Sequence, residues 1–196
     1  MNTTNSEIGQ QSAAAPTRVA DGIICMGGED WWYHNRGHYD MQMMREASRE
    51  VPVLYVNSIG MRTPTPSEGT VFFKRILRKL KSLARGLRQV RENFWVLSPI
   101  VPPGGAGGLV AAWLLAVQIN LALRHLGIRS PLLWVACPPG EIVIGRLKNM
   151  VAVVYQRTDK FETFTGVEAE RIKNIDRRLK RVADLTLFCS PWLIEQ

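Results

Sequence analysis

Short apolar runs alternate with longer amphipathic segments along most of the chain. Six of these runs are rich in residues that favour strands and lack an apolar–polar alternation, which is typical of strands buried on both faces of a sheet. Turn-forming residues such as glycine, proline, asparagine and serine follow most of the runs. The six predicted strands are Gly22–Met26, Val53–Val56, Phe94–Leu97, Leu132–Ala136, Val151–Tyr155 and Leu185–Cys189.

The segments between these runs repeat apolar residues every three or four positions, which predicts helices. The predicted helices are Tyr39–Glu50, Val71–Arg91, Ala106–Leu123, Glu141–Lys148 and Val167–Val182, with a further one opening at Pro191. Parallel strands joined by right-handed helical crossovers form a sheet that is covered on both faces. The pattern therefore predicts an α/β fold with a doubly wound, mostly parallel, Rossmann-like sheet.

The 196 residues suffice for one domain of ordinary size. Residues 1–18 are polar and lack both a basic start and an apolar core, so we expect a disordered tail there and no signal peptide. Residues 19–196 form the predicted domain. The last helix stops soon after it opens, and we expect the chain to be the front part of a longer protein.

Charge changes this picture at one segment only. The chain has 25 basic and 17 acidic residues, a net charge of +8, and residues 72–91 hold eight basic residues and no acid. We favour a membrane-surface helix with a cationic face toward anionic lipid. The alternative is a solvated helix that packs its apolar stripe on the sheet, and nucleic acid is disfavoured because no aromatic readers are interleaved. The predicted membrane-surface residues are Lys74, Arg75, Arg78, Lys79, Lys81 and Arg85.

The segment Ala106–Leu123 is the one serious candidate for a membrane span. Gln118 and Asn120 interrupt it, and Arg124 and His125 follow it. A span needs roughly 20 apolar residues, so we favour a buried helix.

The three cysteines are widely spaced and include no CxxC pair. This usage is typical of reduced, buried thiols in a cytosolic protein. The histidines and cysteines are also far apart in the sequence, so we expect neither a metal site nor a bound cofactor.

In an open parallel sheet, ligands bind beyond the carboxyl ends of the strands. The loop after the first strand carries Gly27 and Gly28, which allow a close approach of the backbone. It also carries Trp31 and Trp32, whose flat faces suit sugar rings, and Arg36 near a helix start that favours anions. The alternative is a surface loop whose tryptophans pack under the edge of the sheet. The GxGxxG fingerprint is absent, which disfavours a dinucleotide site.

Two side chains are candidates for a general base. Asp159 follows the fifth strand and His38 precedes the first helix. Arg157 and Lys160 flank Asp159, so this carboxylate could instead be a loop residue that the two cations neutralise. Asn57, after the second strand, and Arg157 complete the predicted ligand-binding residues.

Three stretches resemble the N-terminal half of GT-B glycosyltransferases, in the nucleotide-sugar-dependent group that includes the family 4 enzymes. The first runs from Ile23 through the aromatic loop to Asn57, and the second is Leu133–Pro138. The third and most distinctive is Val153–Phe161, followed by a charged helix and by Ala183–Pro191. Gln156 stands where the family often has an acid, which puts a two-acid arrangement there in doubt.

The resemblance implies a hexosyltransferase-type enzyme of polysaccharide or glycolipid assembly that uses a nucleotide-sugar as co-substrate. This chain would supply the domain that binds a saccharide or lipid-linked acceptor, and a C-terminal domain beyond Gln196 would bind the donor. The chain alone is then expected to be inactive. Asp159 would be the base only in an inverting enzyme. The expected location is the cytoplasm, peripheral at the inner face of the membrane.

A non-catalytic α/β binding module, recruited to a membrane or a polyanion, is the alternative. The reading frame past Gln196 distinguishes the two. A second domain with a glycine-rich strand–helix turn favours the transferase, and a stop codon favours the module.

Overall fold

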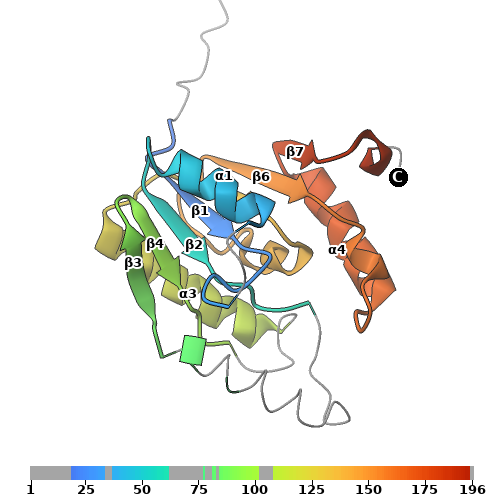
Figure 1. Cartoon of the computed structure of the whole chain (residues 1–196), viewed down its shortest axis with the longest axis horizontal. Helices are drawn as coiled ribbons and strands as arrows, with labels where there is room; N and C mark the ends of the chain where they lie inside the picture. Colours follow the sequence, from blue (N-terminus) through green and yellow to red (C-terminus); the bar gives the residue numbers. More distant parts are fainter. Residues whose placement is uncertain are drawn as a thin grey trace, which may run out of the picture.

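The computed structural model describes residues 19–33, 37–61, 77, 81–82, 84–101 and 108–194. The described residues form one seven-stranded sheet with helices on both faces (Figure 1). In chain order the elements are β1 Gly22–Met26, α1 Tyr39–Ala47, β2 Val53–Val56, β3 Leu87–Arg91, β4 Phe94–Leu97, α3 Leu109–Leu126, β5 Pro131–Val135, η2 Pro138–Val143, β6 Ala152–Arg157, η3 Phe161–Thr163, α4 Ala169–Val182, β7 Leu185–Phe188 and η4 Pro191–Leu193.

The sheet is mostly parallel and Rossmann-like, which confirms the predicted α/β class. The strand order is β3-β4-β2-β1-β5-β6-β7, and only the β3–β4 pair is antiparallel. From β1 the chain builds one half through β2 and β4, and then returns to the centre to build β5, β6 and β7. The direction of strand addition therefore reverses between β1 and β5.

Alternate residues of β1, β2, β4 and β5 belong to two separate apolar cores. Ile24 and Met26 of β1 belong to the core that α3, η2 and α4 cover. Cys25, between them, belongs to the core on the opposite face, where Met41 and Met44 of α1 pack. The central strands are almost wholly buried because both faces are covered, as their unbroken apolar sequences predict.

The predicted helix over Val71–Arg91 is wrong at its C-terminal end. Leu87–Arg91 is strand β3, which pairs antiparallel with β4. Gly86 has φ +57°, a left-handed conformation that ends the helical pattern, and Asn93 at φ 52° makes the turn into β4. Leu87 and Val90 are partly buried on opposite faces of the sheet and the residues between them are exposed, which suits an edge strand. Their three-residue spacing continues the helical periodicity upstream, which conceals the strand.

Most other elements differ from their predicted bounds by one to three residues, and two differences bear on the site. The predicted helix Glu141–Lys148 is a short 3₁₀ segment, η2, which ends at Val143 because Ile144 is extended and Gly145 has φ +77°. Strand β6 continues through Gln156 and Arg157, which were predicted to lie in the loop after it. The predicted tail, residues 1–18, lies outside the described residues.

Helix α3 is the predicted apolar helix, and its two polar residues have specific partners. Gln118 donates from Nε2 to the Ile100 carbonyl at 2.9 Å and accepts from the Ile100 N–H at 2.8 Å. Among the described residues, the Asn120 side chain bonds only the Ala116 carbonyl of its own helix. One face of α3 packs on the sheet, but the opposite face exposes Leu109, Val110, Trp113 and Leu121. Among the described helices, α3 alone is long and apolar enough to cross a membrane by length and composition.

Candidate functional site

The carboxyl edge of the sheet between β1 and β5 brings the loop after β1 beside η2. Reversal of the strand order at this point separates the two outgoing loops, and open α/β sheets bind ligands there. Gly27 leaves β1 against the ring of Tyr55, which a Cβ atom would overlap. Gly140 of η2 faces Met26 of β1, with 2.7 Å between its ideal Cβ position and the Met26 Cβ. Both glycines are therefore required by packing between the elements that form this edge.

Asp40 fastens the start of the loop. It lies in the first turn of α1, is 5% exposed, and accepts from the Gly28 N–H at 3.0 Å and the Tyr55 hydroxyl at 2.8 Å. The Tyr55 hydroxyl also lies 3.2 Å from the Glu29 carbonyl oxygen. Burial raises the pKa of Tyr55, and the Asp40 carboxylate adds to the rise, so this phenol stays protonated and donates. The first residues after β1 are thereby held in one conformation.

Trp31 and Asn57 fasten the next part of the loop. Trp31 is buried and its ring packs on those of Tyr55 and Phe94, with centroids 5.5 and 4.8 Å away. The backbone N–H of Trp31 donates to Asn57 Oδ1 at 2.9 Å, and Asn57 is itself fully buried. The alternative interpretation, in which tryptophans of this loop pack beneath the sheet edge, therefore describes Trp31. Asn57 fixes the backbone of the loop through its buried side chain.

Trp32 follows Trp31 in the loop and is partly exposed. Its Nε1 donates to Ser98 Oγ at 3.0 Å, and the guanidinium of Arg85 lies 4.5 Å from its ring centroid. Arg85 also lies 5.6 Å from the centroid of Tyr33. Of the predicted membrane-surface residues, Lys81 is exposed and Arg85 contacts the aromatic loop. The other four, Lys74, Arg75, Arg78 and Lys79, lie outside the described residues. The predicted ligand-binding residue Arg36 also lies outside them.

Arg157 is the centre of a buried charge network on the α4 face of the sheet. It is 2% exposed and pairs with Asp176 at 2.8 Å and Glu162 at 3.2 Å. Asp176 also accepts from the Tyr155 hydroxyl at 2.7 Å and pairs with Lys180 at 3.0 Å. Two carboxylates thus balance two cations, which removes the cost of burying either charge alone. Arg157 Nε is buried without an acceptor.

The two candidate bases lie on different loops. His38 is exposed at the N-cap of α1, and its carbonyl accepts from Gln42. Asp159 is exposed two residues beyond β6. Since β5 stands between β1 and β6, about 10 Å of sheet separates the strands that carry them. Both residues are exposed, whereas Asp40 and Asp176 are buried.

The buried thiols offer no nucleophile. Burial, with Asp40 as the next cause, raises the pKa of Cys137 to about 12 and that of Cys25 well above its usual value. Cys189 is exposed, in keeping with its place beyond the edge strand, which corrects the expectation that all three cysteines are buried. Within the described part of the chain, no group of three or more histidine, cysteine or acidic residues could hold a metal ion.

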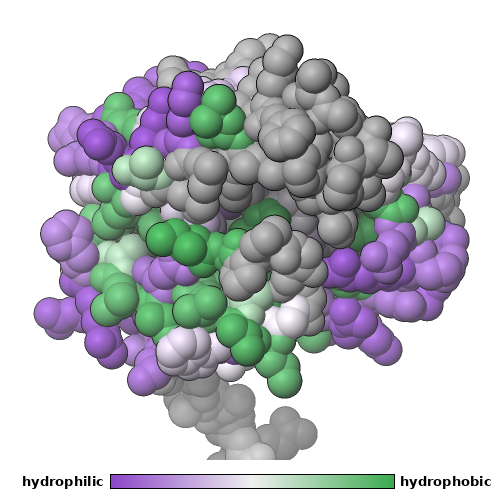
Figure 2. All heavy atoms as spheres, turned by 90° about the horizontal axis from the view of Figure 1, so that it is seen from below, coloured by the Kyte–Doolittle hydropathy of each residue, from purple (hydrophilic) through white to green (hydrophobic). Residues whose placement is uncertain are grey.

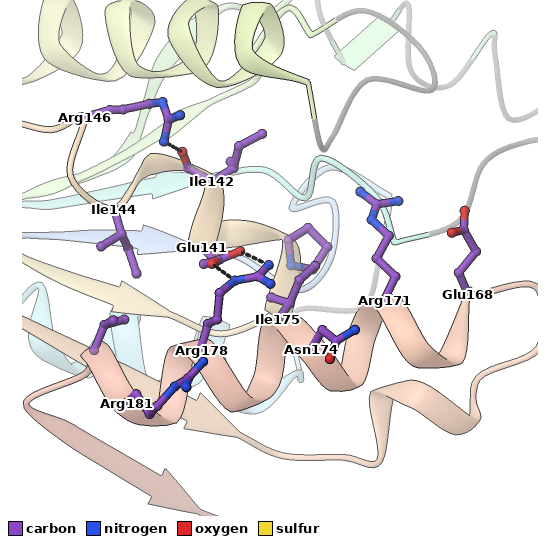
Figure 3. A pocket seen from close by; sticks show the side chains of 12 residues that line it. Glu141, Ile142, Ile144, Arg146, Glu168, Arg171, Asn174, Ile175, Arg178 and Arg181 are labelled. Atoms are coloured by element: carbon purple, nitrogen blue, oxygen red, sulfur yellow. Dashed lines mark hydrogen bonds and ion pairs between the residues drawn. The ribbon is translucent and has the colours of Figure 1, made fainter.

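A groove of about 890 Å³ lies between η2 and α4 (Figure 3). Arg178 of α4 binds Glu141 of η2 through two bonds of 2.6 and 3.0 Å across it. Arg171 and Arg181 extend from the same helix, and Arg146 lies on the opposite side, where it donates to the Ile142 carbonyl. Apolar residues line the rest of the groove, namely Pro139, Ile142, Ile144, Ile175 and Val182.

Sequence reasoning missed Asp40, Asp176 and this groove. Asp40 and Asp176 occupy positions that face the core of otherwise amphipathic helices, and an acid at such a position signals a buried partner. The groove had no comparable signal, because its two walls come from elements 25 or more residues apart.

Comparison of the sequence with protein-family models and with curated proteins yields no match.

Proposed function

We propose that this chain is the acceptor-binding domain of a GT-B glycosyltransferase that moves a sugar from a nucleotide-sugar to a saccharide or lipid-linked acceptor. The observation that carries the proposal is the edge between β1 and β5. There, reversal of the strand order coincides with an aromatic loop that Asp40, Asn57 and Ser98 hold in place. The sequence resemblance over Val153–Phe161 and Ala183–Pro191 supports the same reading.

In this proposal the buried residues position the site and the exposed residues contact the acceptor. Trp32 offers a partly exposed ring for stacking on a sugar, since Ser98 and Arg85 hold it from the side. Trp31, Asn57 and Arg157 are engaged by partners within the domain, so they act by fixing the loop after β1 and the end of β6. The sequence also predicts that these residues contact the acceptor directly, and that stays a prediction.

Either His38 or Asp159 is the proposed acceptor of the proton from the attacking hydroxyl. Their exposure suits residues that become enclosed only when an acceptor and a facing donor domain are present. Asp159 serves as base only if transfer inverts the sugar. The donor would be bound by a second domain outside this chain.

The test is sugar transfer by the protein translated from the complete reading frame, with radiolabelled nucleotide-sugars and a panel of saccharide and lipid-linked acceptors. We expect Asp159→Asn or His38→Ala to lower kcat by about 100-fold or more, the usual contribution of a general base. Glu92→Gln and His125→Ala are matched controls, because the turn before β4 and the end of α3 lie at the opposite edge of the sheet. Full activity in both Asp159→Asn and His38→Ala would remove the catalytic assignment. Acceptor binding without transfer would favour the binding module.

A further inference from the structure

The outer surface of α3 is mostly apolar from Leu109 to Leu121, where Asn120 interrupts it, and the exposed Arg124 and His125 end it. Leu109, Val110, Trp113 and Leu121 are 79, 68, 60 and 56% exposed, and Leu114 and Val117 between them are partly exposed. Figure 2 shows this surface from below, as a green area with hydrophilic residues at its sides. Scattered apolar residues are ordinary on a protein surface, but six apolar residues gathered on one face of a helix mark a contact surface.

The neighbouring groove supplies positive charge on the same face of the sheet. α3, η2 and α4 all cover one core, and η2 contacts both helices. Glu141 neutralises Arg178, but Arg171 and Arg181 have no ion-pair partner among the described residues, and Arg146 bonds only a backbone carbonyl. Arg146 lies on the side of the groove toward α3 (Figure 3). The face thus joins an apolar helix to three guanidinium groups that no acid pairs with in the described part of the chain.

We propose that this face, the outer side of α3 with the arginine groove beside it, docks on an anionic lipid bilayer. The apolar side chains of α3 enter the boundary between headgroups and acyl chains, where tryptophan is favoured. Arg146, Arg171 and Arg181 bind lipid phosphates, since guanidinium pairs with phosphate through two parallel hydrogen bonds. α3 then lies on the membrane without crossing it, because its other face is packed on the sheet.

A second copy of the chain is the competing occupant, and the charge argues against it. An isologous interface would bring the arginine grooves of both copies to one contact, with only Glu168 and the already paired Glu141 as acids lining each groove. Anionic lipid offers the complementary charge instead.

This inference rests on the membrane setting of the proposed function but places the contact on a surface separate from residues 72–91. Its test is flotation of the whole chain with vesicles of phosphatidylcholine alone or with phosphatidylglycerol, so it does not depend on sugar transfer. We expect binding to the anionic vesicles, weakened at least about tenfold in the double variant Trp113→Gln and Leu121→Gln. Arg171→Gln and Arg181→Gln should each weaken it about fivefold.

Matched control variants lie away from this face. Trp192 is 54% exposed in η4, and Arg45 is exposed on α1 over the opposite face of the sheet, so Trp192→Gln and Arg45→Gln should bind as the wild type does. Circular dichroism and thermal unfolding verify that each variant is folded. Wild-type binding by the α3 and arginine variants would overturn the proposal. Sedimentation that shows a dimer lost in Trp113→Gln, with vesicle binding unchanged, would assign the face to a second copy instead. Loss of transfer with vesicle binding intact would count against the proposed function alone.

Discussion

Buried polar side chains, rather than exposed ones, determine the local conformation at the carboxyl edge. Asp40, Asn57 and Asp176 each accept or donate to several groups that are distant in the sequence. Removal of one such group leaves its partners buried without a bond, which costs more than the bond itself contributes. The strongest single-residue effects on stability are therefore expected at these positions.

Asp176→Ala should destabilise the fold by about 3–5 kcal/mol, because Arg157 and Lys180 then lose a buried carboxylate. Urea unfolding followed by circular dichroism measures the change. Glu170→Ala on the same helix is the control, since Glu170 pairs with Lys173 on the surface and its loss should leave stability nearly unchanged. Equal effects of the two substitutions would contradict the network.

The thiols give a residue-scale prediction for pH. In the folded chain the pKa of Cys137 is about 12, against 9.0 for an unperturbed thiol. The folded state holds the thiol proton of Cys137 more tightly than the unfolded state does. The unfolding free energy is therefore unaffected by this thiol below about pH 9, and it falls as pH rises toward 12 because only the unfolded chain loses the proton. Cys137→Ala should flatten the fall of the unfolding free energy over this range. An unchanged slope would show that the thiol titrates normally.

Labelling with iodoacetamide at pH 8 checks the same assignment without unfolding. Cys189 is exposed and should react, whereas Cys25 and Cys137 should react only in denaturant. Mass spectrometry of tryptic peptides distinguishes the three sites. Prompt labelling of Cys137 in the native chain would contradict its burial.

At the scale of elements, the apolar runs alone predicted most of the sheet. Val53–Val56 and Phe94–Leu97 are strands with the predicted bounds, because each lies between turn residues and is buried on both faces. Strand β3 escaped prediction because it is an edge strand whose two apolar residues, Leu87 and Val90, continue the helical spacing upstream. The same limit applies to the site. The loop after β1 was found from its composition, but the division into buried Trp31 and partly exposed Trp32 depends on Tyr55 and Phe94, which are distant in sequence.

The two polar residues within the apolar helix α3 are expected to differ in their effect on stability. Gln118→Ala should cost about 1 kcal/mol, because Gln118 holds the chain that leaves β4 through two bonds to Ile100. Asn120→Ala should be neutral or stabilising by about 0.5 kcal/mol, since Asn120 bonds only its own helix and alanine favours helix more. Thermal unfolding of the two variants under one condition provides the comparison. A larger loss in Asn120→Ala would contradict the assigned roles.

At the scale of the whole molecule, the fold separates two surfaces. The carboxyl edge carries the aromatic loop and both candidate bases, and the face of α3 and α4 carries the apolar stripe and the arginine groove. A domain that docks on a membrane by one surface leaves the other free to receive an acceptor from that membrane. The two proposals are therefore compatible, although each has its own test.

The central claim is that the edge between β1 and β5 receives a saccharide acceptor. Titration of the ¹⁵N-labelled chain with a panel of oligosaccharides, followed by amide and indole shifts, tests it most directly. We predict that a binding saccharide shifts the Trp32 indole and the amides of Gly28, His38 and Asp159, and that Trp32→Ala abolishes these shifts while the fold is retained. Saccharide-induced shifts confined to other surfaces, or no shifts with any saccharide of the panel, would contradict the account.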